Sequence, residues 1–110
     1  MRLLDLSAKE RPTVGIILPD GMRLDVFTPT KSLRETFTFL GDALTKVANK
    51  TATDEDLDTM YDITARILSR NKQSITLSKS DLEERTDIED ITAILAAYIE
   101  FLTETVGSKN

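Results

Sequence analysis

The sequence contains no cysteine and no histidine, and these two absences exclude much of the common chemistry of active sites. Without cysteine the chain has no disulfide, no thiolate nucleophile and no cysteine-ligated metal. Without histidine it has neither a Ser-His-Asp triad nor a Cys-His pair, and it lacks the usual general base at neutral pH. We therefore expect a protein that is not an enzyme, holds no metal or cofactor, and works by binding or assembly.

Aromatic side chains and long apolar runs are also scarce. The chain has no tryptophan, two tyrosines and four phenylalanines, which leaves little for stacking against bases or sugars. No apolar run approaches the roughly 20 residues that span a bilayer. The acidic Asp5 interrupts the apolar start of the chain, where a signal peptide would continue. These features predict a cytoplasmic protein with no membrane partner.

Charge is distributed unevenly along the chain. The formal net charge is −5 at pH 7, with 8 basic and 6 acidic side chains in residues 1–50 and 6 basic and 13 acidic in residues 51–110. Phosphate backbones and anionic lipids repel such a chain, so we expect no nucleic-acid partner. The asymmetry favours head-to-tail self-association or a basic partner. A simpler explanation is that acidic helix N-termini gather in the second half.

The first 30 residues have the pattern of a β-hairpin. A β-branched run over 14–18 is followed by a run over 22–27 in which every second residue is apolar. Between them, Pro-Asp-Gly at 19–21 presets the first position of a turn and supplies a glycine for left-handed backbone after it. The pattern predicts two strands joined by a three-residue loop. It stays open whether residues 1–7 form a third strand.

From residue 31 onward the apolar period lengthens to that of a helix. We expect helices over about 31–49, 54–70, 81–85 and 87–106, and it stays open whether 81–106 is one bent helix or two. The expected N-caps are Thr30, Thr53, Ser80 and Thr86, the last two within capping boxes. The residues expected in the core are Leu33, Phe37, Leu40, Leu44, Leu57, Met60, Ile67, Ile88, Ile91, Leu95, Ile99 and Leu102.

These elements predict an α+β fold that is mostly α, with the N-terminal hairpin packed on about four helices. An isolated two-stranded hairpin is marginally stable in water, so it must pack on them. We expect the last helix to be central. Residues 1–107 are expected to form a single domain, and residues 108–110 a frayed C-terminal tail.

Two acidic clusters resemble metal or acid–base sites. The run from Asp54 to Asp58 begins a calcium-loop pattern, but the glycine and glutamate that such a loop requires are Thr59 and Ala65 here. A second cluster, between 81 and 90, has the carboxylates for acid–base or two-metal chemistry. Both clusters lie at expected helix starts, where acids meet free backbone N–H groups. We therefore expect solvated, helix-capping roles for them.

Two lysines are candidates for Schiff-base chemistry, which requires a desolvated amine. Lys31 and Lys46 both lie near expected helix ends with charged or polar neighbours. We therefore expect both amines to be exposed and unreactive.

The last predicted helix has an unusually wide apolar face. At 100° per residue its apolar arc spans about 160°, against the roughly 100° that faces one core. The surplus edge consists of Ile94 and Phe101 beside the small Ala97. The candidate protein-binding residues are Ile94, Ala97, Tyr98 and Phe101. They would dock a second copy of the chain or an apolar helix of a partner. The alternative is that this helix is buried on several sides within its own domain.

The order of parts is typical of one protein family. The stretch from Ser80 to Phe101 contains a Leu-Glu-Glu run, a break at Arg85-Thr86, and then an aliphatic helix with the aromatic pair Tyr98 and Phe101. The hairpin over 16–27, followed by Thr-Pro-Thr-Lys at 28–31, precedes it. This arrangement resembles the tail assembly chaperones of long-tailed bacteriophages and prophages.

The resemblance implies a non-enzymatic, homo-oligomeric protein that binds the tape-measure protein, keeps its long helices soluble and recruits tail-tube subunits. It implies a location in the cytoplasm of the bacterial host and absence from the mature virion. Genes of this family often make a longer product by ribosomal slippage, with which a Ser-Lys-Asn sequence at 108–110 is compatible. The main alternative is a generic acidic adaptor or regulatory domain. An acidic DNA mimic and a carboxylate enzyme are further alternatives.

Overall fold

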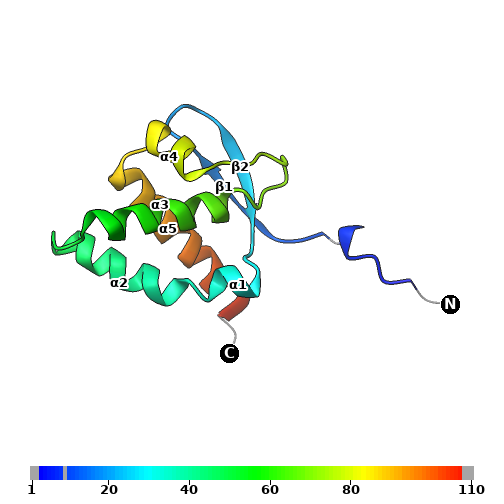
Figure 1. Ribbon diagram of the computed structural model, residues 1–110. Coiled ribbons are helices and arrows are strands. Elements are labelled where there is room, and N and C mark those ends of the chain that lie inside the picture. The colour runs from blue at the N-terminus through cyan, green and yellow to red at the C-terminus, as the bar shows by residue number, and fades with distance from the viewer. Residues whose placement is uncertain (1–2, 9, 108–110) are drawn as a thin grey trace.

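The hairpin forms where the sequence predicts it (Figure 1). The computed structural model describes residues 3–8 and 10–107. Strand β1 (Thr13–Ile17) pairs antiparallel with β2 (Arg23–Phe27). In the loop between them, the Gly21 N–H donates to the Leu18 carbonyl at 2.8 Å. Gly21 has a φ of +94°, in the left-handed region that glycine enters most readily.

The helices follow the hairpin and confirm an α+β fold that is mostly α. They are α1 (Lys31–Arg34), α2 (Phe37–Ala48), α3 (Asp54–Leu68), α4 (Lys79–Arg85) and α5 (Ile88–Leu102). A 3-10 turn over Leu6–Ala8 precedes the hairpin, and a π-helical turn over Thr103–Gly107 follows α5. The predicted tail over 108–110 lies outside the described residues.

The predicted helix over 31–49 is divided in two at Glu35 and Thr36. The Thr36 hydroxyl donates to the Leu33 carbonyl at 2.6 Å, and the Thr36 backbone N–H donates to the same oxygen at 3.1 Å. This local side-chain bond competes with the regular helical pattern. The apolar spacing continues across the break, which is why periodicity alone did not predict it.

The predicted caps Thr30 and Thr53 are confirmed, but α4 begins earlier than expected. Ser78 caps this helix instead of Ser80. The Ser78 hydroxyl accepts from the Asp81 N–H at 3.0 Å, and the Asp81 carboxylate accepts from the Ser78 N–H at 2.9 Å. The prediction did not consider aspartate at the third helical position, where Asp81 completes the capping box with Ser78.

Helix α5 likewise begins with a box of two aspartates. Asp87, not Thr86, is its N-cap, with Asp90 as the reciprocal partner. The Thr86 hydroxyl instead donates to the Leu82 carbonyl at the end of α4, at 2.6 Å. Residues 81–106 therefore form two helices that meet at Thr86 and Asp87.

One hydrophobic core joins the hairpin to the helices (Figure 1), and α5 contributes as many buried apolar residues to it as α3. Helix α3 packs against α1, α2, α4, α5 and β2, while α5 also packs against β1. Helix α5 packs against both α3 and the hairpin and has five buried residues, so the expected central position is shared by α3 and α5.

Seven of the predicted core residues are buried, namely Leu33, Leu40, Met60, Ile67, Ile91, Leu95 and Leu102. Phe37, Leu44, Leu57 and Ile88 are partly buried against the core. Ile99 is also only partly buried. The prediction missed the hairpin's contribution, Ile16, Leu18, Leu24 and Val26, all of which are buried.

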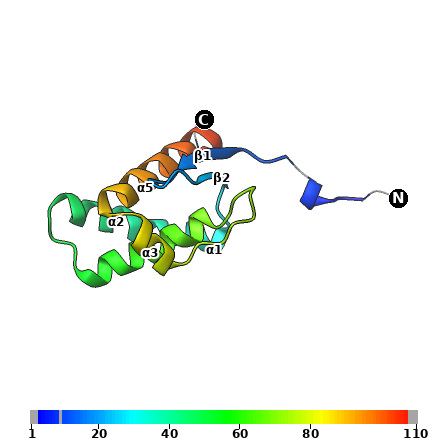
Figure 2. The ribbon, with the colours of Figure 1, turned by 90° about the horizontal axis from the view of Figure 1, so that it is seen from above.

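Residues 3–8, which we call the N-terminal arm, lie apart from the rest of the protein in both views (Figures 1 and 2). The sequence left undecided whether residues 1–7 form a third strand. Residues 3–7 do not form one, and Leu6–Ala8 is a 3-10 turn. The Asp5 carboxylate accepts from the Ser7 N–H at 3.1 Å and stabilises this turn.

Candidate functional site

The four predicted binding residues of α5 do not share one surface. Ile94 and Tyr98 are 8% and 0% exposed, so both belong to the core. Phe101 is partly buried, and its ring centroid lies 6.0 Å from that of Tyr98. Ala97 is exposed. Self-association through this helix stays a prediction, and its surface must be sought around Ala97.

The burial of Ile94 and Tyr98 has a definite structural cause. The Tyr98 hydroxyl donates to the Phe27 carbonyl of β2 at 2.7 Å, so the hairpin covers this side of α5. Burial raises the pKa of Tyr98 well above its ordinary value of 10.0. The wide apolar arc of α5 therefore faces two elements of its own domain, as the alternative interpretation of the sequence held.

The outer surface of α5 is made of small side chains bordered by acids. Ala93, Ala96 and Ala97 are exposed along its middle, and Glu89 and Glu100 are exposed at its two ends. Small residues allow another backbone to approach a helix closely. A hollow on the α2 side of this surface supplies the apolar contacts that such an approach requires.

The first hollow lies between the end of α2 and the start of α5. It has a volume of about 360 Å³ and is lined by Val47, Ile88, Glu89, Thr92, Ala93 and Ala96. Its lining is apolar apart from the Glu89 carboxylate and the Thr92 hydroxyl. The Thr92 hydroxyl is already engaged, because it donates to the Ile88 carbonyl at 2.8 Å.

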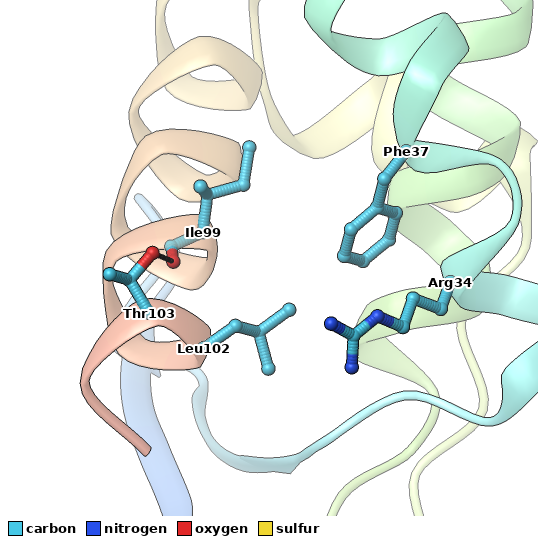
Figure 3. A pocket seen from close by; sticks show the side chains of 5 residues that line it. All are labelled: Arg34, Phe37, Ile99, Leu102 and Thr103. Carbon is cyan, nitrogen blue, oxygen red and sulfur yellow. Dashed lines mark hydrogen bonds between the residues drawn. The ribbon is translucent and has the colours of Figure 1, made fainter. Parts of the chain in front are cut away.

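A second hollow lies further along the same side of α5 (Figure 3). It has a volume of about 260 Å³ and is lined by Arg34, Phe37, Ile99, Leu102 and Thr103. Phe37 and Arg34 point across it toward Ile99 and Leu102 (Figure 3). We call the two hollows together the α2–α5 groove.

Arg34 gives the second hollow one cation at an otherwise apolar mouth. Its side chain forms no ion pair with any residue in the described ranges 3–8 and 10–107. Phe37 beside it is fixed by edge-to-face contact with Tyr98, with ring centroids 6.3 Å apart. This mouth therefore has both an apolar wall and a charge for an incoming acidic group.

The acidic clusters lie where helix capping places them. Asp56 pairs with Thr53 in a capping box, and the backbone hydrogen bond from Thr53 lowers the pKa of Asp56. The backbone hydrogen bond from Ser78 lowers the pKa of Asp81 in the same way. Among residues 3–8 and 10–107, no three carboxylates gather as a metal site requires.

The two candidate lysines form surface ion pairs. The Lys31 amine lies 2.7 Å from the Glu35 carboxylate, and its side chain is 90% exposed. The Lys46 amine lies 3.3 Å from Asp42 and 3.8 Å from Asp56. Neither amine is desolvated in the way that a Schiff-base lysine requires.

The groove is the feature of this protein best suited to binding. Its two hollows follow one another along α5, with Arg34 at one and Glu89 at the other. Apolar grooves beside a helix are common docking sites for an amphipathic helix. No helix within the described part of the chain is long and apolar enough to cross a membrane. No protein-family model, curated protein or solved structure matches this chain, so its function is argued from the groove and from the sequence.

Proposed function

We propose that this protein is a non-enzymatic tail assembly chaperone of a phage or prophage. It holds apolar helices of the tape-measure protein in the α2–α5 groove and recruits tail-tube subunits. It acts in the cytoplasm of the bacterial host and is absent from the mature virion. The α2–α5 groove carries the proposal, and the resemblance of the stretch from Ser80 to Phe101 supports it.

The length of the groove suits a helix. Its lining on α5 runs from Ile88 to Thr103. At about 1.5 Å per residue this spans roughly 22 Å, or about four helical turns. A client helix with apolar residues at i, i+3, i+4 and i+7 places its anchors within that distance.

The charges at the ends of the groove give it a direction. Glu89 lines one hollow and Arg34 lines the other. A client helix is therefore expected to place a basic residue near Glu89 and an acidic residue near Arg34. Such pairing adds orientation more than affinity.

The proposal is tested by co-expression with the tape-measure protein encoded in the same genome. We expect the wild-type chain to keep that protein soluble and to co-purify with it. Ala96→Arg places a bulky cation in the groove and should abolish both effects. Ala97→Arg is the matched control, because Ala97 is exposed on the same helix but does not line the groove.

Two outcomes would contradict the proposal. One is a tape-measure protein that stays insoluble with the wild-type chain. The other is equal binding by the wild type and Ala96→Arg, with circular dichroism showing both folded. If the groove instead captures a protein unrelated to tails, in a genome without an adjacent tape-measure gene, the acidic adaptor is the better description.

A further inference from the structure

The outer edge of β1 is open, whereas that of β2 is covered. On β2, the Phe27 N–H donates to the Arg70 carbonyl at 2.8 Å, and the Asp25 carbonyl accepts from the Lys72 N–H at 3.0 Å. On β1, the alternation of the ladder turns the backbone groups of Gly15 and Ile17 away from β2. They form no hydrogen bond with any residue that the structure describes. An open strand edge is a template for another chain.

A hollow lies beside this open edge, and Ala93 separates it from the first hollow of the α2–α5 groove. It has a volume of about 280 Å³ and is lined by Ile17, Pro19, Asp90, Ala93 and Ile94. Ile17 is 65% exposed, although it is a large apolar side chain within a strand. Ala97 continues the surface, because it lies one helical turn beyond Ala93. We call this hollow, Ala97 and the β1 edge the hairpin-side surface.

Among the side chains that the structure describes, the other large exposed apolar ones are in the N-terminal arm. Leu3, Leu4 and Leu6 are 88%, 81% and 54% exposed. Exposed leucines concentrated in six residues favour burial against an apolar surface elsewhere. The hairpin-side surface combines an apolar hollow with an open strand edge, so it suits an extended segment that carries apolar side chains.

The sequence around the arm is weakly basic. Arg2 precedes the leucines and Lys9 and Arg11 follow them, while Asp5 and Glu10 are acidic, so residues 2–11 have a net charge of +1. The charged residues of α5 are all acidic, and Asp90 lines the hollow itself. Opposite charges at the rim favour the encounter of the two segments and set their orientation.

We propose that the N-terminal arm of one copy docks on the hairpin-side surface of a second copy. Its leucines fill the hollow beside Ile17, and its extended part lies along the open edge of β1. Within one chain the arm extends away from the rest of the protein (Figures 1 and 2), and the strand that follows it begins at Thr13, whereas the hollow lies at the Ile17 end. The docked arm therefore belongs to a second copy. This inference is independent of the α2–α5 groove.

The mass of the protein in solution tests the assembly. Light scattering at several hundred micromolar should show a species at least twice the 12.3 kDa of the chain. Leu4→Ser combined with Leu6→Ser should weaken association at least tenfold, as should Ala97→Arg on the opposite surface. Ala96→Arg is the matched control and should associate like the wild type. At a concentration low enough for the wild type to be monomeric, all variants should keep its melting temperature, because the changed side chains are exposed.

A spin label distinguishes a second copy from the chain itself. The chain has no cysteine, so Ser7→Cys provides a single labelling site. Mixed with an isotope-labelled chain that carries no spin label, it should broaden the amide signals of Ile17, Ala93 and Ala97. The proposal would be overturned if these signals broaden only when the isotope and the spin label are on the same chain. A monomeric wild type, or association unaffected by the arm variants, would also overturn it.

Discussion

The Tyr98 hydroxyl donates a hydrogen bond of 2.7 Å to the Phe27 carbonyl and so joins α5 to the end of β2. The Phe27 N–H donates in turn to the Arg70 carbonyl at 2.8 Å, next to the end of α3. One strand residue is thereby tied to two helical segments that lie far away in sequence. These two bonds help to fix the position of the hairpin on the helices.

Replacement of Tyr98 by phenylalanine should destabilise the protein while keeping its shape. The Tyr98 side chain is completely buried, so its loss leaves the Phe27 carbonyl without that partner. We expect Tyr98→Phe to lower the free energy of unfolding by about 1–3 kcal/mol, measured by urea denaturation. Tyr61→Phe, at a half-buried tyrosine, should have a smaller effect. Equal effects of the two changes would contradict the role given to the Tyr98 hydrogen bond.

The sequence predicted the features that depend on neighbouring residues. The 19–21 loop and the Thr53 cap are set by local backbone chemistry, and both are observed. The burial of Ile94 and Tyr98 depends instead on where the hairpin packs. The periodicity of apolar residues along a helix does not show this. The α2–α5 groove was missed for the same reason, because two helices separated by α3 and α4 in sequence form it. The sequence did contain one signal for the groove, namely the alanines at 93, 96 and 97, which lie opposite the apolar face of α5.

Asn71 is held by side-chain hydrogen bonds to its neighbours in sequence. Its side chain is buried, and its amide nitrogen donates to the carbonyls of Leu68 and Ile75, both at 2.7 Å. Its amide oxygen accepts from the Ile75 N–H at 3.0 Å. The residue thus closes the turn after α3 as well as capping that helix.

Asn71→Ala removes these three bonds and leaves buried carbonyl groups without this partner. We expect a loss of about 2–4 kcal/mol in the free energy of unfolding, measured by thermal or urea denaturation. Asn49→Ala is the matched control, since Asn49 is an exposed C-cap and should change stability by less than about 0.5 kcal/mol. A loss of similar size at both positions would show that the side-chain bonds of Asn71 contribute little.

Three carboxylates should make the protein sensitive to acid. Hydrogen bonds from Gln73 and Arg23 lower the pKa of Asp25, and capping bonds lower those of Asp56 and Asp81. A lowered pKa in the folded state means that the unfolded chain binds protons first as the pH falls. The resulting stabilisation is present above the ordinary value of 3.8 and is lost as the pH falls through the folded-state values.

The pH prediction is checked by urea denaturation between pH 2 and 7 and by NMR titration of the three carboxyl groups. Gln73→Ala should raise the pKa of Asp25 toward its ordinary value and leave those of Asp56 and Asp81 unchanged. A free energy of unfolding that does not decrease below pH 4 would show that these bonds persist to the same extent in the unfolded chain.

Lys50 marks a place where a substitution should stabilise the protein. It follows α2 with a φ of 60°, in the left-handed region. Its N–H donates to the Val47 carbonyl at 3.1 Å, and the Thr51 N–H donates to the Lys46 carbonyl at 2.8 Å. These are the two bonds of a Schellman motif, whose left-handed position is most often glycine.

Lys50→Gly should therefore raise the free energy of unfolding, because a Cβ atom in the left-handed region costs about 1–2 kcal/mol. Part of this gain is offset by the greater freedom of glycine in the unfolded chain, so we expect a net increase of about 0.5–1 kcal/mol. Lys72→Gly, at an exposed lysine without a positive φ, should give no increase. If both changes lower the melting temperature equally, the Lys50 backbone is not strained and the motif tolerates lysine without cost.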